Sequence, residues 1–240
     1  MSAILILPVG YYQGNEDSSK VHLGLAGGTG QYATVLRSCG EVTSKETMTY
    51  KDVAAGVEYR PDFNEPIVFG LRAGHLSTQT QYNVHSGSRL DNGYINPYFS
   101  IEGKYVGFGA GWLRNIGPVL DESLLDLNTD FRKSTDVPSG HLRLGKRSGT
   151  YFIVSFFEGM PIVSEYGYLM TGVGYGGSSK WDFVGGLSAG FYDGAGIFMS
   201  LNRKTSQHGW PGIAVRLGSS EGEFEGGMSF HWFFQLNRKN

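Results

Sequence analysis

Apolar and polar positions alternate with a period of two along most of the chain. Between residues 95 and 102, for example, Ile, Pro, Phe and Ile stand at the odd-numbered positions, and Asn, Tyr, Ser and Glu stand at the even-numbered positions. Successive side chains of a β-strand point to opposite faces, so this spacing predicts strands with one apolar face and one polar face.

The clearest hairpin is predicted where Gly103 and Lys104 form a two-residue turn. Glycine suits the first central position of such a turn because it adopts positive φ angles without steric cost. The turn fixes the register of the two strands. We therefore expect Ile101 to lie opposite Val106, with the partners on either side following in order.

The repeated alternation predicts twelve strands. Their expected ranges are 21–37, 47–60, 66–78, 93–102, 105–114, 139–145, 150–158, 167–176, 181–192, 195–204, 210–218 and 223–236. Connections after even-numbered strands are short, and most of those after odd-numbered strands are longer. This arrangement is typical of barrels in an outer membrane. The predicted fold class is all-β, an antiparallel up-and-down transmembrane β-barrel.

Composition supports a β fold and narrows the classes of function. Glycine supplies 37 of the 240 residues, about twice its usual share of ~7%, and glycine is a poor helix former. The net charge is −2, so no basic surface is available for nucleic acid. The single Cys39 cannot form a disulfide within the chain.

The polar face of the predicted strands carries charges separated mainly by glycine. Glycine on a solvent-facing strand lowers stability, whereas inside a closed barrel it leaves room for charged side chains and water. The polar face is therefore predicted to line the lumen, and the apolar face to meet lipid. The predicted lumen-lining residues are Glu58, Arg60, Arg72, Tyr98, Glu102, Arg143, Asp182, Arg216, Glu225 and His231.

Aromatic residues gather toward the ends of the predicted strands, as expected of the girdles at membrane interfaces. The residues placed there are Tyr59, Trp112, Tyr151, Tyr175, Trp181, Trp210, Trp232 and Phe234. The predicted strands are about as long as a strand that crosses the hydrocarbon layer.

The chain resembles bacterial outer-membrane β-barrel proteins over residues 21–236. The resemblance rests on the strand pattern, on glycine-rich segments such as 105–112, and on the aromatic-alternating last strand 224–234, although the chain continues past Phe234. It implies a location in the bacterial cell outer membrane and contact with outer-membrane lipid and lipopolysaccharide. The resemblance does not imply any particular protein partner.

Residues 1–20 are set apart from the barrel domain, which is predicted over 21–240. The apolar stretch 3–9 lacks the basic residues before it and the small-residue cleavage site of a complete signal peptide. The segment is interpreted as either the remnant of a signal peptide or a periplasmic lead-in. No run of 18 apolar residues predicts a transmembrane helix.

One constellation resembles an enzyme motif. His75 and Ser77 share a face of the third predicted strand, and Asp91 has the matching parity at the start of the fourth. A hydroxyl, an imidazole and an acid are the elements of a catalytic triad. The pair is similar to the His-x-Ser-Asn motif of outer-membrane lipid A deacylases, with Thr78 in the place of Asn.

The function expected from the sequence is non-enzymatic, either a narrow channel or a structural protein of the envelope. Arg72, Arg143, Glu58 and Glu102 are expected to form either a structural ion-pair network or a selectivity lining. Two alternatives remain: an outer-leaflet lipid A acyl hydrolase that uses His75 and Ser77, and a soluble ligand-binding β-barrel. No cofactor and no metal site is predicted.

Overall fold

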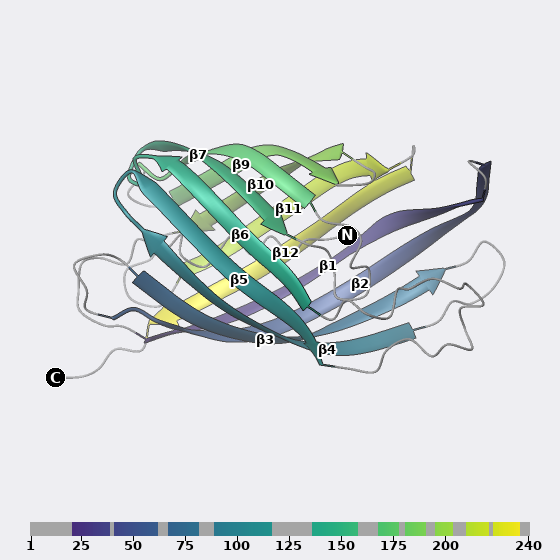
Figure 1. The fold of residues 1–240 in the computed structure, drawn as a ribbon, viewed down its shortest axis with the longest axis horizontal. Helices are drawn as coiled ribbons and strands as arrows, with labels where there is room; N and C mark the ends of the chain where they lie inside the picture. The colour runs from purple at the N-terminus through teal and green to yellow at the C-terminus, as the bar shows by residue number, and fades with distance from the viewer. Residues whose placement is uncertain are drawn as a thin grey trace.

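The computed structural model describes residues 21–38, 41–61, 67–81, 89–116, 136–157, 168–177, 181–190, 195–203, 210–220 and 223–235. These residues form twelve β-strands that close into one barrel (Figure 1). Each strand pairs antiparallel with its neighbours in the sequence, and β12 closes the barrel against β1. Among the described residues, no helix is long and apolar enough to span a membrane. The predicted fold class is confirmed.

All twelve strands begin and end within three residues of their predicted bounds, except that β2 and β4 begin earlier. They are β1 (Val21–Ser38), β2 (Glu41–Tyr59), β3 (Ile67–Gln81), β4 (Arg89–Glu102), β5 (Val106–Ile116), β6 (Asp136–Gly145), β7 (Thr150–Phe157), β8 (Tyr168–Tyr175), β9 (Trp181–Gly190), β10 (Ala195–Arg203), β11 (Trp210–Ser220) and β12 (Glu223–Gln235). The turns after β4 and β6 lie at the end of the barrel that we call the short-turn rim. The opposite end is the long-loop rim.

The prediction of a long loop between the first two strands is wrong. β2 begins at Glu41 and pairs with β1 as far as Ser38. The ladder to β12 ends at Gln31 and the ladder to β3 ends at Thr47, so the rest of this hairpin projects past the neighbouring strands (Figure 1). The segment 41–47 is polar, and a strand outside the barrel wall needs no apolar face, which is why its sequence resembles a loop.

The predicted register of the β4–β5 hairpin is also wrong, by two residues. Ile101 pairs with Phe108 instead of Val106. The turn is longer because its backbone also bonds to the next turn: the Gly145 amide donates to the Tyr105 carbonyl oxygen at 2.8 Å. A shift of two residues leaves every side chain on its predicted face, so the inward and outward sets are unchanged.

The pairing also sets the dimensions of the barrel. We follow the paired residues from strand to strand around the barrel, starting at Val21 on β1, and reach Phe224 on β12. Phe224 lies two positions beyond Gly226, the partner of Gln31, so the row returns to β1 about twelve residues from its start. This offset of about twelve residues around the barrel corresponds to a strand tilt of about 35° and a backbone diameter of about 22 Å. β7 and β8, with 8 residues each, then span about 22 Å, close to the apolar band of outer-membrane barrels.

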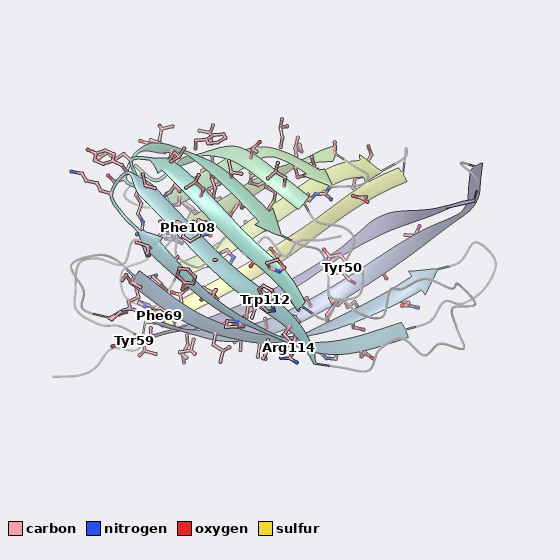
Figure 2. The ribbon with its side chains drawn as sticks, viewed as in Figure 1. Tyr50, Tyr59, Phe69, Phe108, Trp112 and Arg114 are labelled. Carbon is pink, nitrogen blue, oxygen red and sulfur yellow. The ribbon has the colours of Figure 1, made fainter. Side chains whose placement is uncertain are left out.

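The outer surface of the barrel is apolar. Val53 is 68% exposed, Leu187 is 65% exposed, and every strand contributes at least one exposed large apolar side chain to this surface. Tyr59, Phe69 and Phe108 lie toward the short-turn rim, and Trp112 lies further along β5 (Figure 2). A continuous apolar surface of this size favours contact with lipid.

Most of the predicted girdle residues with described side chains face outward, but the placement of Tyr151 is wrong. Tyr151 is buried inside the barrel, because it has the opposite parity to the outward Phe152. The side chain of Trp210 is outside the described residues.

Large side chains inside the barrel lie over glycines on the neighbouring strand. A Cβ atom added to any of these glycines would overlap the side chain of its register partner. The pairs are Tyr50 with Gly30, Tyr94 with Gly74, Tyr98 with Gly70, His141 with Gly109 and Tyr151 with Gly174. The interior glycines therefore make space for the aromatic and polar side chains beside them.

We predict that Gly70→Ala destabilises the barrel by about 1–3 kcal/mol, because overpacking forces the neighbouring side chain to move. The Tyr98 ring would have to leave its position over residue 70 and its 2.8 Å hydrogen bond to Glu58. Denaturant unfolding in detergent measures the loss. Gly27→Ala is the matched control, since its nearest contact, the Asp52 carbonyl oxygen at 3.4 Å, is an ordinary one.

The cost of Gly70→Ala is expected to shrink when Tyr98 is also replaced by Ala, because the double variant removes the overlap. An equal cost in both backgrounds would contradict the role assigned to this pair.

Candidate functional site

All ten side chains predicted to line the lumen lie on the inward side of the barrel, nine of them on strands and Arg60 directly after the end of β2. Eight are buried, and Arg60 and Tyr98 are half-buried. Nine of them belong to one cluster at the short-turn rim or to two ion pairs further along the lumen, and His231 lies apart from these groups. The carboxylates and guanidinium groups bond to one another in each of these places.

Arg143 is the centre of the cluster at the short-turn rim. It is fully buried, and its Nη1 and Nη2 donate to the carbonyl oxygens of Gly145 and Gly103, each at 2.6 Å. Its Nε donates to Glu102 at 3.3 Å, and the other Glu102 oxygen lies 2.9 Å from His141 Nε2. Arg143 thus joins two turns of this rim through short charge-assisted bonds.

Gly145 is required at this position by its backbone. Its φ of 117° lies in the left-handed region, which glycine adopts without strain and other residues rarely adopt. Its amide and its carbonyl group both take part in the contacts that join the turns.

A second part of the same cluster lies on β2 and β4. Glu58 is buried, accepts a 2.8 Å hydrogen bond from the Tyr98 hydroxyl, and forms a 3.2 Å ion pair with Arg60. The charge of Arg147, in the turn between β6 and β7, also acts on Glu58.

Arg147 acts electrostatically on carboxylates from several strands. Burial lowers the pKa of its guanidinium group, and the nearby Glu102 opposes this effect. It also interacts electrostatically with Asp182 on β9. Since β2 and β9 are not neighbours in the barrel, the charge of Arg147 acts on carboxylates from different parts of the short-turn rim.

Two ion pairs lie further along the lumen. Arg72 donates from Nη2 to Asp52 at 3.4 Å, and the Tyr94 hydroxyl donates to the same carboxylate at 2.9 Å. On the other side of β1, Arg216 pairs with Glu225 at 3.2 Å and donates to Ser188 Oγ at 3.0 Å. These contacts make Asp52, Tyr94 and Ser188 part of the lining.

The remaining predicted lumen residue, His231, is buried and lies 2.7 Å from the Asn202 side-chain oxygen.

Sequence reasoning did not find every residue of these networks. Asp52 has the parity of Glu58, and His141 has the parity of Arg143, so alternation alone was a sufficient signal for both. Arg147 gives no such signal, because it lies in a turn and reaches the lumen only through the path of its backbone.

The lumen is not polar on all sides. Five of the strands, β7 to β11, turn apolar side chains inward, and these form one buried cluster of Tyr151, Ile153, Met170, Val184, Phe198 and Ala214. The sequence contained a signal for it: residues 151–157 are apolar at nearly every position. The lumen therefore has a charged arc facing an apolar strip.

His75, Ser77 and Asp91 lie on the outer surface. His75 Nε2 is 3.5 Å from Asp91 Oδ1, and Ser77 is the register partner of Asp91. No hydrogen bond links Ser77 to His75 among the described residues. The structure therefore brings the base and the acid together but leaves the hydroxyl unbonded to the base.

In the part of the chain that the structure describes, no three His, Cys, Asp or Glu side chains are placed to hold a metal ion.

No family model and no curated protein matches the chain. Among solved structures, the barrel is similar to the translocator domain of the autotransporter NalP from Neisseria meningitidis, with a TM-score of 0.56 and 7% identity over 92% of this chain and 90% of that chain. The transport unit of the autotransporter AIDA-I from Escherichia coli aligns over 93% and 92% of the two chains at 9% identity with a TM-score of 0.27, from which we draw no conclusion. The likeness to the NalP domain concerns the fold alone.

The closed barrel, its apolar outer surface and its charged interior define a transmembrane β-barrel of the bacterial outer-membrane class. The resemblance found in the sequence is confirmed at this level, and the outer membrane is the location that fits such a barrel. The alternative of a soluble ligand-binding barrel has no support, because that fold needs an apolar core and a polar exterior.

We predict that Ser77→Ala does not change the acylation of lipid A in cells that express the protein, because the Ser77 hydroxyl has no bond to His75. Mass spectrometry of extracted lipid A compares the wild type, the variant and cells without the protein. Loss of an acyl chain with the wild type but not with Ser77→Ala would establish the hydrolase alternative instead.

Proposed function

We propose that the protein is a non-enzymatic channel of the bacterial outer membrane, with a narrow lumen whose tightest part lies at the short-turn rim. The observation that carries this proposal is the position of Arg147 among Glu58, Glu102 and Asp182. These carboxylates come from strands on different sides of the barrel. A cation held among them occupies the path along the barrel axis.

The dimensions of the barrel support a narrow passage. A backbone diameter of about 22 Å leaves a width of roughly 10 Å once side chains of about 6 Å extend from each wall. This width admits ions and small solutes where the interior side chains are small. Long Arg, Glu and Tyr side chains at the short-turn rim reduce it further.

The charges of the lumen also favour this role. The described ion pairs of the lining each join a guanidinium group to a carboxylate, as in Arg72 with Asp52 and Arg216 with Glu225. Such pairs keep polar groups solvated inside a membrane and provide donors and acceptors to a passing solute. A purely structural barrel is the other outcome of the test below.

The outer surface is proposed to contact outer-membrane lipid, with lipopolysaccharide at the long-loop rim. Short turns of outer-membrane barrels lie on the periplasmic side. By this rule Arg114, an outward residue near the opposite end of β5, lies at the level of the outer-leaflet headgroups. Lys51 and His75, outward residues in the middle parts of β2 and β3, lie between that level and the short-turn rim.

We predict that wild-type barrels conduct in planar bilayers and that Arg147→Ala raises the single-channel conductance by a factor of about two or more, because it removes the side chain in the narrowest part. Single-channel recording of purified, refolded protein measures both. Arg203→Ala is the matched control: it removes an arginine near the same rim, but Arg203 lies outside the barrel over the Trp181 ring.

Equal conductance of the wild type and Arg147→Ala would show that the constriction lies elsewhere. The absence of conductance in both would exclude the channel and leave the structural role.

A further inference from the structure

We propose that the lumen binds a small oxyanion, a phosphate or a carboxylate, beside Arg72. The inference deepens the proposed channel function, because the anion must enter the lumen, but binding itself is measurable without conduction. It rests on the bonding of Arg72, on the groups that face the same stretch of wall, and on the small residues between them.

Arg72 uses only part of its hydrogen-bonding capacity. The side chain is buried at 5% exposure, and Nη2 donates to Asp52 while the guanidinium carbon lies 5.6 Å from the centre of the Tyr94 ring. Its Nε and Nη1 have no protein partner among the described residues. A buried donor without a partner is costly, so native structures satisfy it with a ligand or an ordered water.

Two hydroxyl groups in the same region are also without a partner. Tyr50 is 1% exposed, and Ser229 is buried as well, yet neither side-chain oxygen forms a hydrogen bond to a described residue. Tyr50 lies on the inward face of β2, two residues from Asp52. The unpartnered groups are therefore N–H donors and hydroxyls that can donate, and an oxyanion can accept a hydrogen bond from either kind of group.

The wall between these groups carries almost no side chains. Ala26 on β1 pairs with Ala54 on β2 and with His231 on β12, and Gly56 pairs with Arg72. Gly28 lies next to Ser229 in the β1–β12 ladder. From β3 to β12 this stretch of small residues spans about 14 Å, three strand spacings.

The charges around this stretch fit an anion. Arg72 acts electrostatically on His231, and Arg216 acts on Tyr50, so two guanidinium groups influence the region from opposite sides. The nearest carboxylate, Asp52, already accepts bonds from Arg72 and Tyr94, and Glu225 is paired with Arg216. Both carboxylates therefore already accept bonds from the protein, whereas Nε and Nη1 of Arg72 have no acceptor among the described residues.

Inorganic phosphate is the probe for the test. The folded barrel in a non-ionic detergent is titrated into phosphate, and broadening of the ³¹P resonance reports binding; acetate is then added as a competitor. We expect broadening with the wild type, and displacement by acetate if the site accepts either oxyanion. Lack of displacement would assign the site to phosphate alone.

Three variants locate the site. Arg72→Gln and Tyr50→Phe are each expected to weaken phosphate binding, Arg72→Gln by about tenfold or more because it removes a charge-assisted donor. Arg203→Gln is the control, since it removes an equal charge from the outer surface. Heat-modifiable migration on gels shows that each variant is folded, and Tyr50→Phe loses only one oxygen.

No broadening with the wild type, or equal binding by Arg72→Gln, would overturn the proposal. A barrel that binds phosphate through Arg72 but does not conduct would contradict the channel function and leave the anion site standing. A barrel that conducts but does not bind phosphate would contradict the anion site and leave the channel function standing.

Discussion

The barrel depends on a steric constraint inside a closed wall. Twelve strands enclose the lumen in a barrel with a backbone diameter of about 22 Å, and long inward side chains on adjacent strands would collide there. Glycine relieves the crowding where a Tyr or His ring lies flat on the neighbouring strand, as with Tyr98 over Gly70 and Tyr94 over Gly74. The glycine content of the chain therefore belongs to the packing of the lumen as much as to the turns.

This packing arranges the polar groups of the interior. Tyr98 and Tyr94, lying over their glycines, direct hydroxyl groups to Glu58 and Asp52. The two carboxylates in turn pair with Arg60 and Arg72. Charged groups at membrane depth are tolerated because they are bonded to one another away from lipid. The outer face of the same strands can then consist of Leu, Val and Phe.

The sequence predicted which face of each strand points inward, because parity survives errors in strand length and register. It did not predict contacts that depend on register: Glu102 meets His141 and Arg143, residues about 40 positions away. The apolar strip of β7 to β11 was missed because both faces of residues 151–157 are apolar. The path of a turn decides the position of Arg147, and alternation carries no information about it. The shared outward face of His75, Ser77 and Asp91 was predicted, whereas the 3.5 Å distance between His75 and Asp91 depends on the register of β3 and β4.

Neighbouring residues of one strand point to opposite sides, one toward lipid and the next into the lumen. This placement is tested most directly on β9. On a Cys39→Ser background, spin labels at Leu187→Cys and Ser188→Cys are compared in lipid bilayers by their collision rates with oxygen, which concentrates in the hydrocarbon. Leu187 is 65% exposed on the outside and Ser188 is 2% exposed inside. High oxygen access at 187 and low access at 188 is the expected result. Equal access at both positions, or the reverse order, would contradict a lipid-facing apolar surface around a charged lumen.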